Sequence, residues 1–390
     1  MKKNKLLFLS SLVFSLLPST TSCGSYDLVV FNWGEYMDMD RLRQFEKERG
    51  VKVNYLTFDS NENLLAKLEN TYFDICFPSD YAVEELVSKD MIQPLDYSKI
   101  PNFNLETSLV PSLKSALDTL KKPTLGKEGF DMLKYAIPYT WGEVGILYDR
   151  TKISDEEIEK DGWEALRNPI NQDGSKRKVV MYDSARDIFS VALIANGKDI
   201  VDISSDDINI AKDWLSEQKK RIGNNLAYKT EEILDDMPNL KYDICFTYIG
   251  DAIYSMTSVE DDSGEIDYDR FGFYIPPMKD GGKTRTNIYV DAISLAKNST
   301  HTELAYDFIN YMQEHDVAYD NSLYNGYTSP INTIYEEITS ENSEYEDGEG
   351  SFYPIASTYQ IKANENDKFY RYDQKLKTSL EEAWIEVKIS

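Results

Sequence analysis

Cysteine and histidine are scarce in this chain of 390 residues, which has three cysteines and two histidines. Cys76 and Cys245 each lie inside an apolar segment, where buried thiols are more typical than a disulfide or a metal ligand. His301 and His315 lie near the two ends of one predicted helix, which does not favour an imidazole triad or a histidine-rich metal site. No glycine-rich phosphate loop is present. We therefore expect no cofactor, no metal ion and no imidazole-based catalysis.

Long apolar runs are also lacking, and none is comfortably long enough to span a bilayer. The most apolar run, Leu6–Leu17, follows a lysine-containing leader and is succeeded by small residues up to Cys23. This pattern is typical of a signal peptide, and a cysteine at that place resembles the site where bacterial lipoproteins are cleaved and acylated. We expect residues 1–22 to be the signal peptide and Cys23 to be the lipidated first residue of a protein anchored outside the cytoplasmic membrane. Thr20 stands where that motif usually has leucine, so cleavage elsewhere stays open.

Basic residues are outnumbered. The chain has 42 lysines and arginines against 68 acidic residues, which gives a formal net charge of −26. Such a balance argues against nucleic acid or anionic lipid as a partner and favours cationic ligands through electrostatic steering. Acidic surfaces also serve solubility, so this signal is a weak one.

Aromatic residues are plentiful, and one aromatic loop is the most informative motif. The run Phe31–Tyr36, FNWGEY, directly follows the apolar stretch Tyr26–Val30 and is predicted to lie at the end of a strand. Its aromatic faces and its carboxylate, Glu35, suit an organic cation, because aromatic faces attract positive charge and the carboxylate adds a charge-assisted hydrogen bond. Core aromatics beside a turn are the alternative interpretation.

Strand-like and helix-like segments alternate in the first part of the chain. Helices are predicted at Met39–Arg49, at Asn63–Glu69 after the potential caps Asp59 and Ser60, and from Pro78-Ser79-Asp80 onward. The predicted strands are Tyr26–Phe31, Val51–Phe58 and Tyr72–Phe77. This alternation predicts an α/β fold with a mainly parallel sheet, in which ligands bind at the carboxyl ends of the strands.

The second half repeats this arrangement. A strand is predicted at Lys178–Tyr182, a helix at Ser184–Ala195 and another strand at Tyr242–Phe246. The segment FDICF at Phe73–Phe77 is matched by YDICF at Tyr242–Phe246, and each is followed by a polar aromatic loop and a helix. Two similar lobes would explain the match, although a short apolar pattern also recurs by chance.

Seven segments together carry a resemblance to a known family. Their order and spacing are specific, although none is diagnostic alone. They are FNWGEY at 31–36, FDICFPSDY at 73–81, IPYTWG at 137–142, YDSARDIF at 182–189, YIGDA at 248–252, YVDAISLA at 289–296 and NGYTSPIN at 325–332. With these segments the chain resembles the bacterial spermidine/putrescine-binding proteins of ABC transporters, within the larger group of two-lobed periplasmic-type solute receptors.

The resemblance implies a two-lobed periplasmic-binding-protein-like fold. Each lobe would be a mainly parallel sheet flanked by helices, with the ligand cleft between the lobes. The first lobe would comprise residues 23–138 and 290–328, and the second residues 139–289 and 329–390. Crossings between the lobes are expected near Ile137–Thr140, Thr286–Tyr289 and Tyr327–Pro330, and a helix at Thr302–Glu314 would pack on the first lobe.

The resemblance also implies which residues contact the ligand. Two acids, Asp187 and Asp291, match family acids that pair with ammonium nitrogens. Ser184 stands where the family has an acid, and Asp80, at a position that is usually small and neutral, would restore the charge from the opposite lobe. Tyr248 and Tyr289 stand where the best-known spermidine binder has tryptophans. The full predicted set is Trp33, Gly34, Glu35, Tyr36, Ser79, Asp80, Tyr81, Ser184, Asp187, Tyr248, Tyr289, Asp291 and Tyr327.

Physical chemistry supports such a site independently. A polyamine has charged nitrogens separated by methylenes, so it needs carboxylates at intervals with flat apolar faces between them. The resemblance implies a monomeric receptor without catalytic activity, which captures spermidine or putrescine and delivers it to an ABC permease, and the leader pattern adds the lipid anchor. Two alternatives remain open: a receptor of the same shape for a neutral sugar, and a secreted glycosidase that uses two carboxylates such as Asp183 and Asp187.

Overall fold

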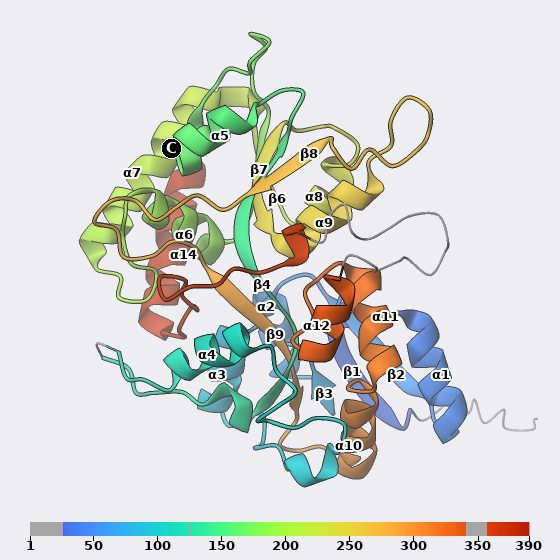
Figure 1. Cartoon of the computed structure of the whole chain (residues 1–390). Coiled ribbons are helices and arrows are strands. Elements are labelled where there is room, and N and C mark those ends of the chain that lie inside the picture. Colours follow the sequence, from blue (N-terminus) through green and yellow to red (C-terminus); the bar gives the residue numbers. More distant parts are fainter. Residues whose placement is uncertain (1–25, 125, 341–356, 390) are drawn as a thin grey trace, which may run out of the picture.

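The computed structural model describes residues 26–124, 126–340 and 357–389. The predicted signal peptide and the predicted lipidation site Cys23 lie outside the described residues. Within the described ranges, no helix is both long and apolar enough to cross a bilayer. Two lobes are visible, one above the other in Figure 1.

The lower lobe of Figure 1 contains the first part of the chain and a later return of it. Its elements are β1 (Leu28–Trp33), α1 (Met39–Arg49), β2 (Val53–Phe58), α2 (Asn61–Leu68), β3 (Ile75–Cys76), α3 (Asp80–Ser88), α4 (Pro111–Leu120), β9 (Ile288–Leu295), α10 (Thr302–Tyr311) and α11 (His315–Asn325). The short helix α12 (Asn332–Ile338) packs beside α11.

The upper lobe is built from the middle of the chain and the C-terminal helix. Its elements are α5 (Asp155–Asp161), β5 (Val179–Tyr182), α6 (Ala185–Ala195), α7 (Ser205–Ile222), β6 (Leu226–Lys229), α8 (Glu232–Asp236), β7 (Ile244–Tyr248), α9 (Ile249–Ser258), β8 (Phe271–Tyr274) and α14 (Gln374–Ile389). Helices α6, α7 and α14 pack against one another in this lobe.

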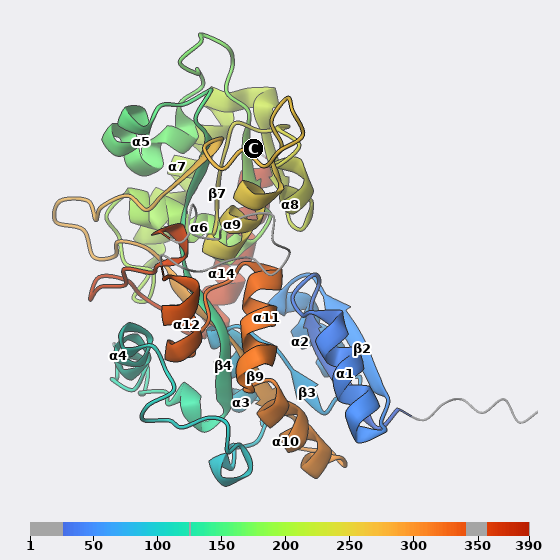
Figure 2. The ribbon, with the colours of Figure 1, turned by 45° about the vertical axis from the view of Figure 1, so that its right-hand side comes forward.

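The long strand β4 (Ala136–Asp149) connects the two lobes, as Figure 2 shows. The strand order is β2-β1-β3-β9-β4-β7-β5-β6, with β8 also paired to β4. The first part of β4 pairs with β9 as far as Glu143, and from Val144 onward it pairs with β7. The outer strands pair in parallel, as predicted, whereas β4 and β9 are antiparallel to their neighbours. The sheet is therefore mixed, and its two halves meet at the crossing in β4.

The matched segments of the two halves occupy equivalent places. Strand β3 lies between a parallel and an antiparallel neighbour, and so does β7. Asp74, just before β3, accepts a 2.8 Å hydrogen bond from the backbone N–H of Val29, and Asp243, just before β7, accepts one of the same length from Lys178. The repeat read from the sequence is therefore structural, and the two lobes share one plan.

The helix ends agree with the sequence prediction only in part. Helix α1 has the predicted bounds, because Asp38 caps its start and Gly50, at φ 66°, ends it. The predicted helix at Thr302–Glu314 ends earlier, at Tyr311, and α11 follows it without having been predicted. The buried side of α11 includes polar residues such as Asn321, so the helix has no continuous apolar stripe by which a sequence reveals it.

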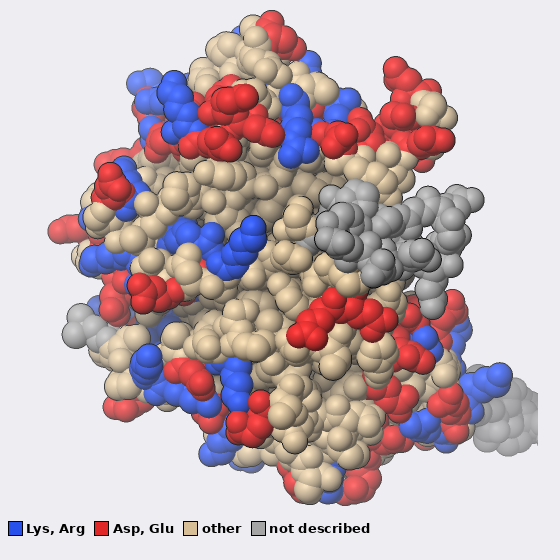
Figure 3. Space-filling model, viewed as in Figure 1, with Lys and Arg blue, Asp and Glu red and all other residues tan. Residues whose placement is uncertain are grey.

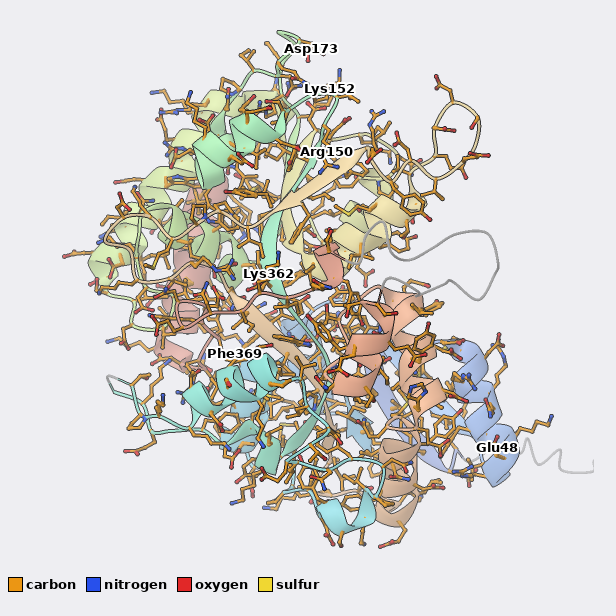
Figure 4. All side chains as sticks on the ribbon, in the orientation of Figure 1. Glu48, Arg150, Lys152, Asp173, Lys362 and Phe369 are labelled. Atoms are coloured by element: carbon orange, nitrogen blue, oxygen red, sulfur yellow. The ribbon has the colours of Figure 1, made fainter. Side chains whose placement is uncertain are left out.

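The C-terminal segment at 357–373 passes between the lobes before α14 begins. Tyr359 Oη accepts the backbone N–H of Ser329 at 2.7 Å, and Ser190 of α6 donates a 2.8 Å hydrogen bond to Tyr370. Figure 4 labels another residue of this segment, Lys362, at the boundary of the two lobes. The segment therefore adds a further connection beside the strands.

The two described cysteines lie in the core, whereas most of the many charged residues lie on the surface. Cys76 and Cys245 are buried and are not disulfide-bonded, as predicted. No group of histidine, cysteine and acidic side chains suitable for a metal ion occurs among the described residues. On the face shown in Figure 3, acidic and basic side chains are interspersed.

Candidate ligand-binding site

The predicted site residues come from separate elements that meet where the lobes join. The first lobe contributes the loop after β1, the start of α3 and the middle of β9. The second lobe contributes the start of α6 and the end of β7, and the turn after α11 adds Tyr327. Parallel strands present their carboxyl ends on one edge of a sheet, which explains why loops far apart in sequence converge here.

Asp291 on β9 is the most closely surrounded acid. Ser79 donates a 2.5 Å hydrogen bond to its Oδ1, and the hydroxyl of Tyr36 donates to its Oδ2. Thr140 Oγ1 lies 2.7 Å from Tyr36 Oη. The side chain is 5% exposed. Burial raises the pKa of Asp291 to about 6, although the two hydroxyl groups favour the ionised form.

Asp80, the first residue of α3, is a second buried acid. Its carboxylate accepts a 3.0 Å hydrogen bond from the backbone N–H of Val290 and a 2.6 Å bond from that of Tyr81. The pKa of Asp80 is raised to about 7, mainly by burial and also by nearby Asp291, although the Val290 N–H and Arg186 favour the ionised form. The site thus contains more than one buried acid, and Asp80 and Asp291 act on each other through a poorly screened interior.

Asp251 on α9 is a third buried acid, which the sequence analysis did not assign to the site. The hydroxyls of Tyr182 and Tyr327 donate to its two oxygens, the latter over 2.5 Å. Burial raises its pKa above the ordinary value. The internal repeat contained a signal for it, because Asp251 follows β7 at the start of a helix, as Asp80 follows β3.

Tyrosine rings fill the space between these acids. The ring centroids of Tyr36 and Tyr327 are 5.0 Å apart, those of Tyr289 and Tyr327 are 6.2 Å apart, and those of Tyr248 and Tyr289 are 4.8 Å apart. The hydroxyl of Tyr289 is buried and has no hydrogen-bond partner among the described residues. An unpaired buried hydroxyl is costly unless a ligand group meets it, so this one is suited to bind a ligand N–H.

The aromatic loop after β1 is only partly brought into this cluster. Trp33 packs against Phe58, with ring centroids 4.6 Å apart, and its indole N–H donates to the backbone of Phe77. Glu35 is exposed, has a φ of 47° and accepts a 2.8 Å hydrogen bond from Tyr324. Gly34, between them, faces Glu231 of the second lobe. Of this loop, Tyr36 alone hydrogen-bonds to a buried acid of the site.

The start of α6 contributes Ser184 and Asp187 in a different way. The Ser184 hydroxyl accepts the backbone N–H of Asp187 and caps the helix. The carboxylate of Asp187 lies 2.8 Å from the guanidinium of Arg186, which stacks on Tyr81 at 4.0 Å. Asp187 is thus inside the site, and its charge already has a cationic partner.

Asp183 and Asp187, the two acids considered for a glycosidase, do not face a common space. Asp183 is exposed and accepts hydrogen bonds from Trp384 and Lys388 of α14. Asp187 lies on the inner side of α6 with Arg186. Two carboxylates that flank one scissile bond must face a common space, and these two have separate partners instead.

A cavity of about 620 Å³ lies between the second lobe and the segment at 357–373. Its lining includes Glu143, Phe271 and Arg285 and none of the predicted ligand residues. The tyrosine and acid cluster is therefore a packed junction that contains charges, and this cavity does not open onto the predicted ligand residues.

Residues 1–271 match the model of a family described as hypothetical lipoproteins, the MG045 family. The chain belongs to the MG045 family. The match begins at the first residue and ends at Phe271, where β8 begins, so it includes most of the second lobe.

Curated relatives of this MG045-family chain are polyamine-binding periplasmic proteins. The putrescine-binding periplasmic protein PotF of Escherichia coli is 28% identical over 298 residues, which are 74% of this chain and 74% of that protein. The spermidine/putrescine-binding periplasmic protein of Salmonella typhimurium is 28% identical over 364 residues, which are 90% of this chain and 91% of that protein. These matches confirm the resemblance that the seven segments indicated.

A solved structure confirms the fold class. The spermidine/putrescine ABC transporter substrate-binding protein PotD of Streptococcus pneumoniae superposes with a TM-score of 0.66 at 26% identity, over 94% of this chain and 99% of that one. The MG045-family chain therefore has the two-lobed α/β fold of periplasmic-type solute-binding proteins. Its lobe boundaries and its ligand residues stay predictions.

Proposed function

We propose that this MG045-family protein is an extracytoplasmic substrate-binding protein that captures a polyamine, putrescine or spermidine, and delivers it to an ABC permease. The observation that carries the proposal is the cluster of three buried acids, Asp80, Asp251 and Asp291, set among tyrosine rings at the lobe junction. Their hydrogen-bond donors are hydroxyl and backbone N–H groups. Buried carboxylates need cationic partners, and a polyamine supplies cations at intervals.

The proposed contacts divide into acids and rings. The three buried acids hold ligand nitrogens, and Tyr289 offers its unpaired hydroxyl. The rings of Tyr36 and Tyr327 lie between acids and cover the methylenes. Trp33, Gly34, Glu35, Ser79, Tyr81, Ser184, Asp187 and Tyr248 form the surrounding wall.

Closure of the two lobes is the proposed mechanism. Asp291 and Asp80 belong to the first lobe and Asp251 to the second, so one ligand that contacts all three stabilises the closed arrangement. The bending regions lie where β4 changes partners, beside Ile288 of β9, and near Tyr327. A permease that recognises the closed form then receives only loaded protein. The protein performs no catalytic step in this mechanism.

We further propose that the mature chain is a monomer held at the membrane by lipid on Cys23. The proposal is supported by the signal-peptide pattern before that cysteine and by the membership of a lipoprotein family. Mass spectrometry of the protein extracted from its native membrane tests the lipid anchor. A mature N-terminus at Cys23 that carries a diacylglyceryl mass supports the anchor, and an unmodified N-terminus contradicts it.

Titration calorimetry of the mature chain with putrescine, spermidine and maltose tests the ligand class. Asp291→Asn is expected to weaken polyamine binding by about 10-fold to 100-fold, because a charged hydrogen bond contributes roughly 1.5 to 3 kcal/mol. Asp243→Asn is the matched control, since that residue is 6% exposed, against 5% for Asp291, but lies outside the site. Maltose binding that is independent of Asp291 would favour a neutral-sugar receptor and contradict the proposal.

A further inference from the structure

Arg186 places a cation of the protein itself inside the tyrosine and acid cluster. Its Cζ lies 4.0 Å from the centroid of the Tyr81 ring and 5.3 Å from that of Tyr370. Its Nη2 lies 2.8 Å from Asp187 Oδ1 and donates a 3.2 Å hydrogen bond to Tyr248. The side chain is 15% exposed. Because Arg186 is on α6 and Tyr81 is on α3, the guanidinium joins the two lobes.

Three partners of Arg186 belong to the predicted ligand set. An aromatic face, a carboxylate and a phenolic oxygen are the groups that bind an alkylammonium nitrogen well. At Tyr81, Asp187 and Tyr248 the guanidinium already makes these contacts. A ligand nitrogen at the same place would meet a like charge in a poorly solvated site, which is unfavourable.

The three buried acids Asp80, Asp251 and Asp291 differ from Asp187 in this respect. Asp251 and Asp291 receive hydrogen bonds from hydroxyl groups, and Asp80 receives them from backbone N–H groups. The rings of Tyr36 and Tyr327, each bonded to one of these acids, have centroids 5.0 Å apart. Among the described residues, no cationic side chain pairs directly with Asp80, Asp251 or Asp291, whereas Asp187 is paired with Arg186.

We propose that Arg186 determines the specificity of the site, because its guanidinium takes the place of one ligand nitrogen at Asp187, so that the remaining acids bind a diamine in preference to a triamine. This inference rests on the polyamine-binding function proposed above. The ligand spans from Asp251 to Asp80 and Asp291. Asp187 then acts through Arg186, which it neutralises and orients, and does not hold a ligand nitrogen directly.

Titration calorimetry with putrescine and spermidine tests the inference on the unaltered mature chain and on two variants. The unaltered chain is expected to bind putrescine at least about 10-fold more tightly than spermidine, since an unpaired or repelled buried ammonium loses more than one charged hydrogen bond. Arg186→Gln frees Asp187 and is expected to shift the ratio of the two dissociation constants by about 10-fold or more toward spermidine. Arg186→Lys keeps the charge and is expected to keep the preference for putrescine.

Arg167→Gln is the matched control. Arg167 is also 15% exposed, pairs with Glu164 at 2.9 Å and stacks on Trp214 at 5.0 Å, but it lies in the second lobe away from the site. Its replacement removes the same kind of interaction and is expected to leave the ratio unchanged. A change of similar size in this variant would overturn the inference, because the effect would then be a general one.

Two further outcomes keep the inference testable if Arg186→Gln does not fold. Asp187→Asn is expected to weaken putrescine binding by less than about 3-fold, whereas Asp291→Asn weakens it by at least about 10-fold. Equal losses in both variants overturn the inference, and so does an unaltered chain that binds spermidine as tightly as putrescine. If the unaltered chain binds neither amine, the proposed function itself fails. If it binds both and folded Arg186→Gln keeps the ratio, this inference alone fails.

Discussion

Tyr327 Oη lies 2.5 Å from Asp251 Oδ1, so the turn after α11 is bonded to helix α9 of the second lobe. The same ring lies 5.0 Å from that of Tyr36, which is bonded to Asp291 of the first lobe. Tyr327 therefore connects an acid of one lobe with a ring of the other. Separation of the lobes must change at least one of these two contacts.

Tyr327→Phe is expected to weaken putrescine binding by about 10-fold, because the hydroxyl that supports ionised Asp251 is lost. The ring remains, so the loss should be smaller than that of Asp291→Asn. Titration calorimetry measures both. Tyr97→Phe, which also removes one phenolic hydrogen bond, to the backbone of Leu133, is the control and should bind as the unaltered chain does. Equal affinity of Tyr327→Phe and the unaltered chain would remove Tyr327 from the site.

Ligand affinity is expected to rise with pH. Burial raises the pKa of Asp291 to about 6 and that of Asp80 to about 7, while Arg186 lowers both and Asp251 raises that of Asp291. A cationic ligand binds the ionised carboxylates, so binding between pH 5 and 7 must release protons. Calorimetry at pH 5.5 and pH 8, in buffers of different ionisation enthalpy, measures both the affinity and the number of protons released on binding. We expect affinity to be higher at pH 8 by about 10-fold or more, and an affinity that is constant over this range contradicts the assignment.

The same two acids affect the stability of the unliganded protein in the opposite direction. In the unfolded chain they ionise near pH 4, whereas in the folded chain they keep their protons up to about pH 6 to 7. The native state therefore binds more protons in this window. Their contribution to the free energy of unfolding is fully present below about pH 4 and is lost as the pH rises through the folded-state values. Urea unfolding of Asp80→Asn should show a smaller loss between pH 5 and 8 than the unaltered chain.

Arg285 joins two buried acids behind the crossing of β4. Its guanidinium bonds to both oxygens of Asp367 at 2.7 Å and also to Glu143, the last residue of β4 that pairs with β9. Arg285→Gln leaves two buried acids without their cation and is expected to lower the free energy of unfolding by about 3 kcal/mol. Urea unfolding measures the loss. The double variant Glu143→Gln with Arg285→Gln should recover part of it, and a double variant as unstable as the single one contradicts the pairing.

The repeated aspartates before β3 and β7 should contribute equally to the free energy of unfolding. Asp74→Ala and Asp243→Ala each remove an acceptor of a strand N–H group and are expected to lower the free energy of unfolding by about 1 to 3 kcal/mol. Asp40→Ala, at an 81% exposed side chain on α1, is the control and should change it by less than about 0.5 kcal/mol. If one variant were as stable as the control, the aspartates of the two lobes would not have the same stabilising role, which would contradict the prediction.

Local signals in the sequence predicted the first lobe well. A capping aspartate, Asp38, and a terminal glycine, Gly50, define α1 completely. Alternation of strand and helix placed β1, β2 and the start of α3, and the repeated DICF segment placed β7. These features depend on residues close to one another in the chain, which is why the sequence alone reveals them.

The long strand β4 and the charges of the site were less predictable. β4 is buried along its whole length and contains Pro138 and two glycines, so neither an alternating pattern nor a plain apolar run marks it. Asp251 and Arg186 are placed in the site by contacts with residues more than 60 positions away in the chain. Asp251 is bonded to Tyr327, and Arg186 stacks on Tyr81. Burial of a charge depends on tertiary contacts, so the sequence listed candidate acids without showing which of them already has a cation.

Native mass spectrometry of the mature chain tests the central claim most directly. The protein is freed of bound ligand by unfolding, refolded, and then mixed with putrescine and spermidine near neutral pH. We expect a complex with one polyamine per chain, in which the diamine predominates when both amines are present. A refolded chain that stays at its own mass with either amine would contradict the claim that the two lobes close around a polyamine.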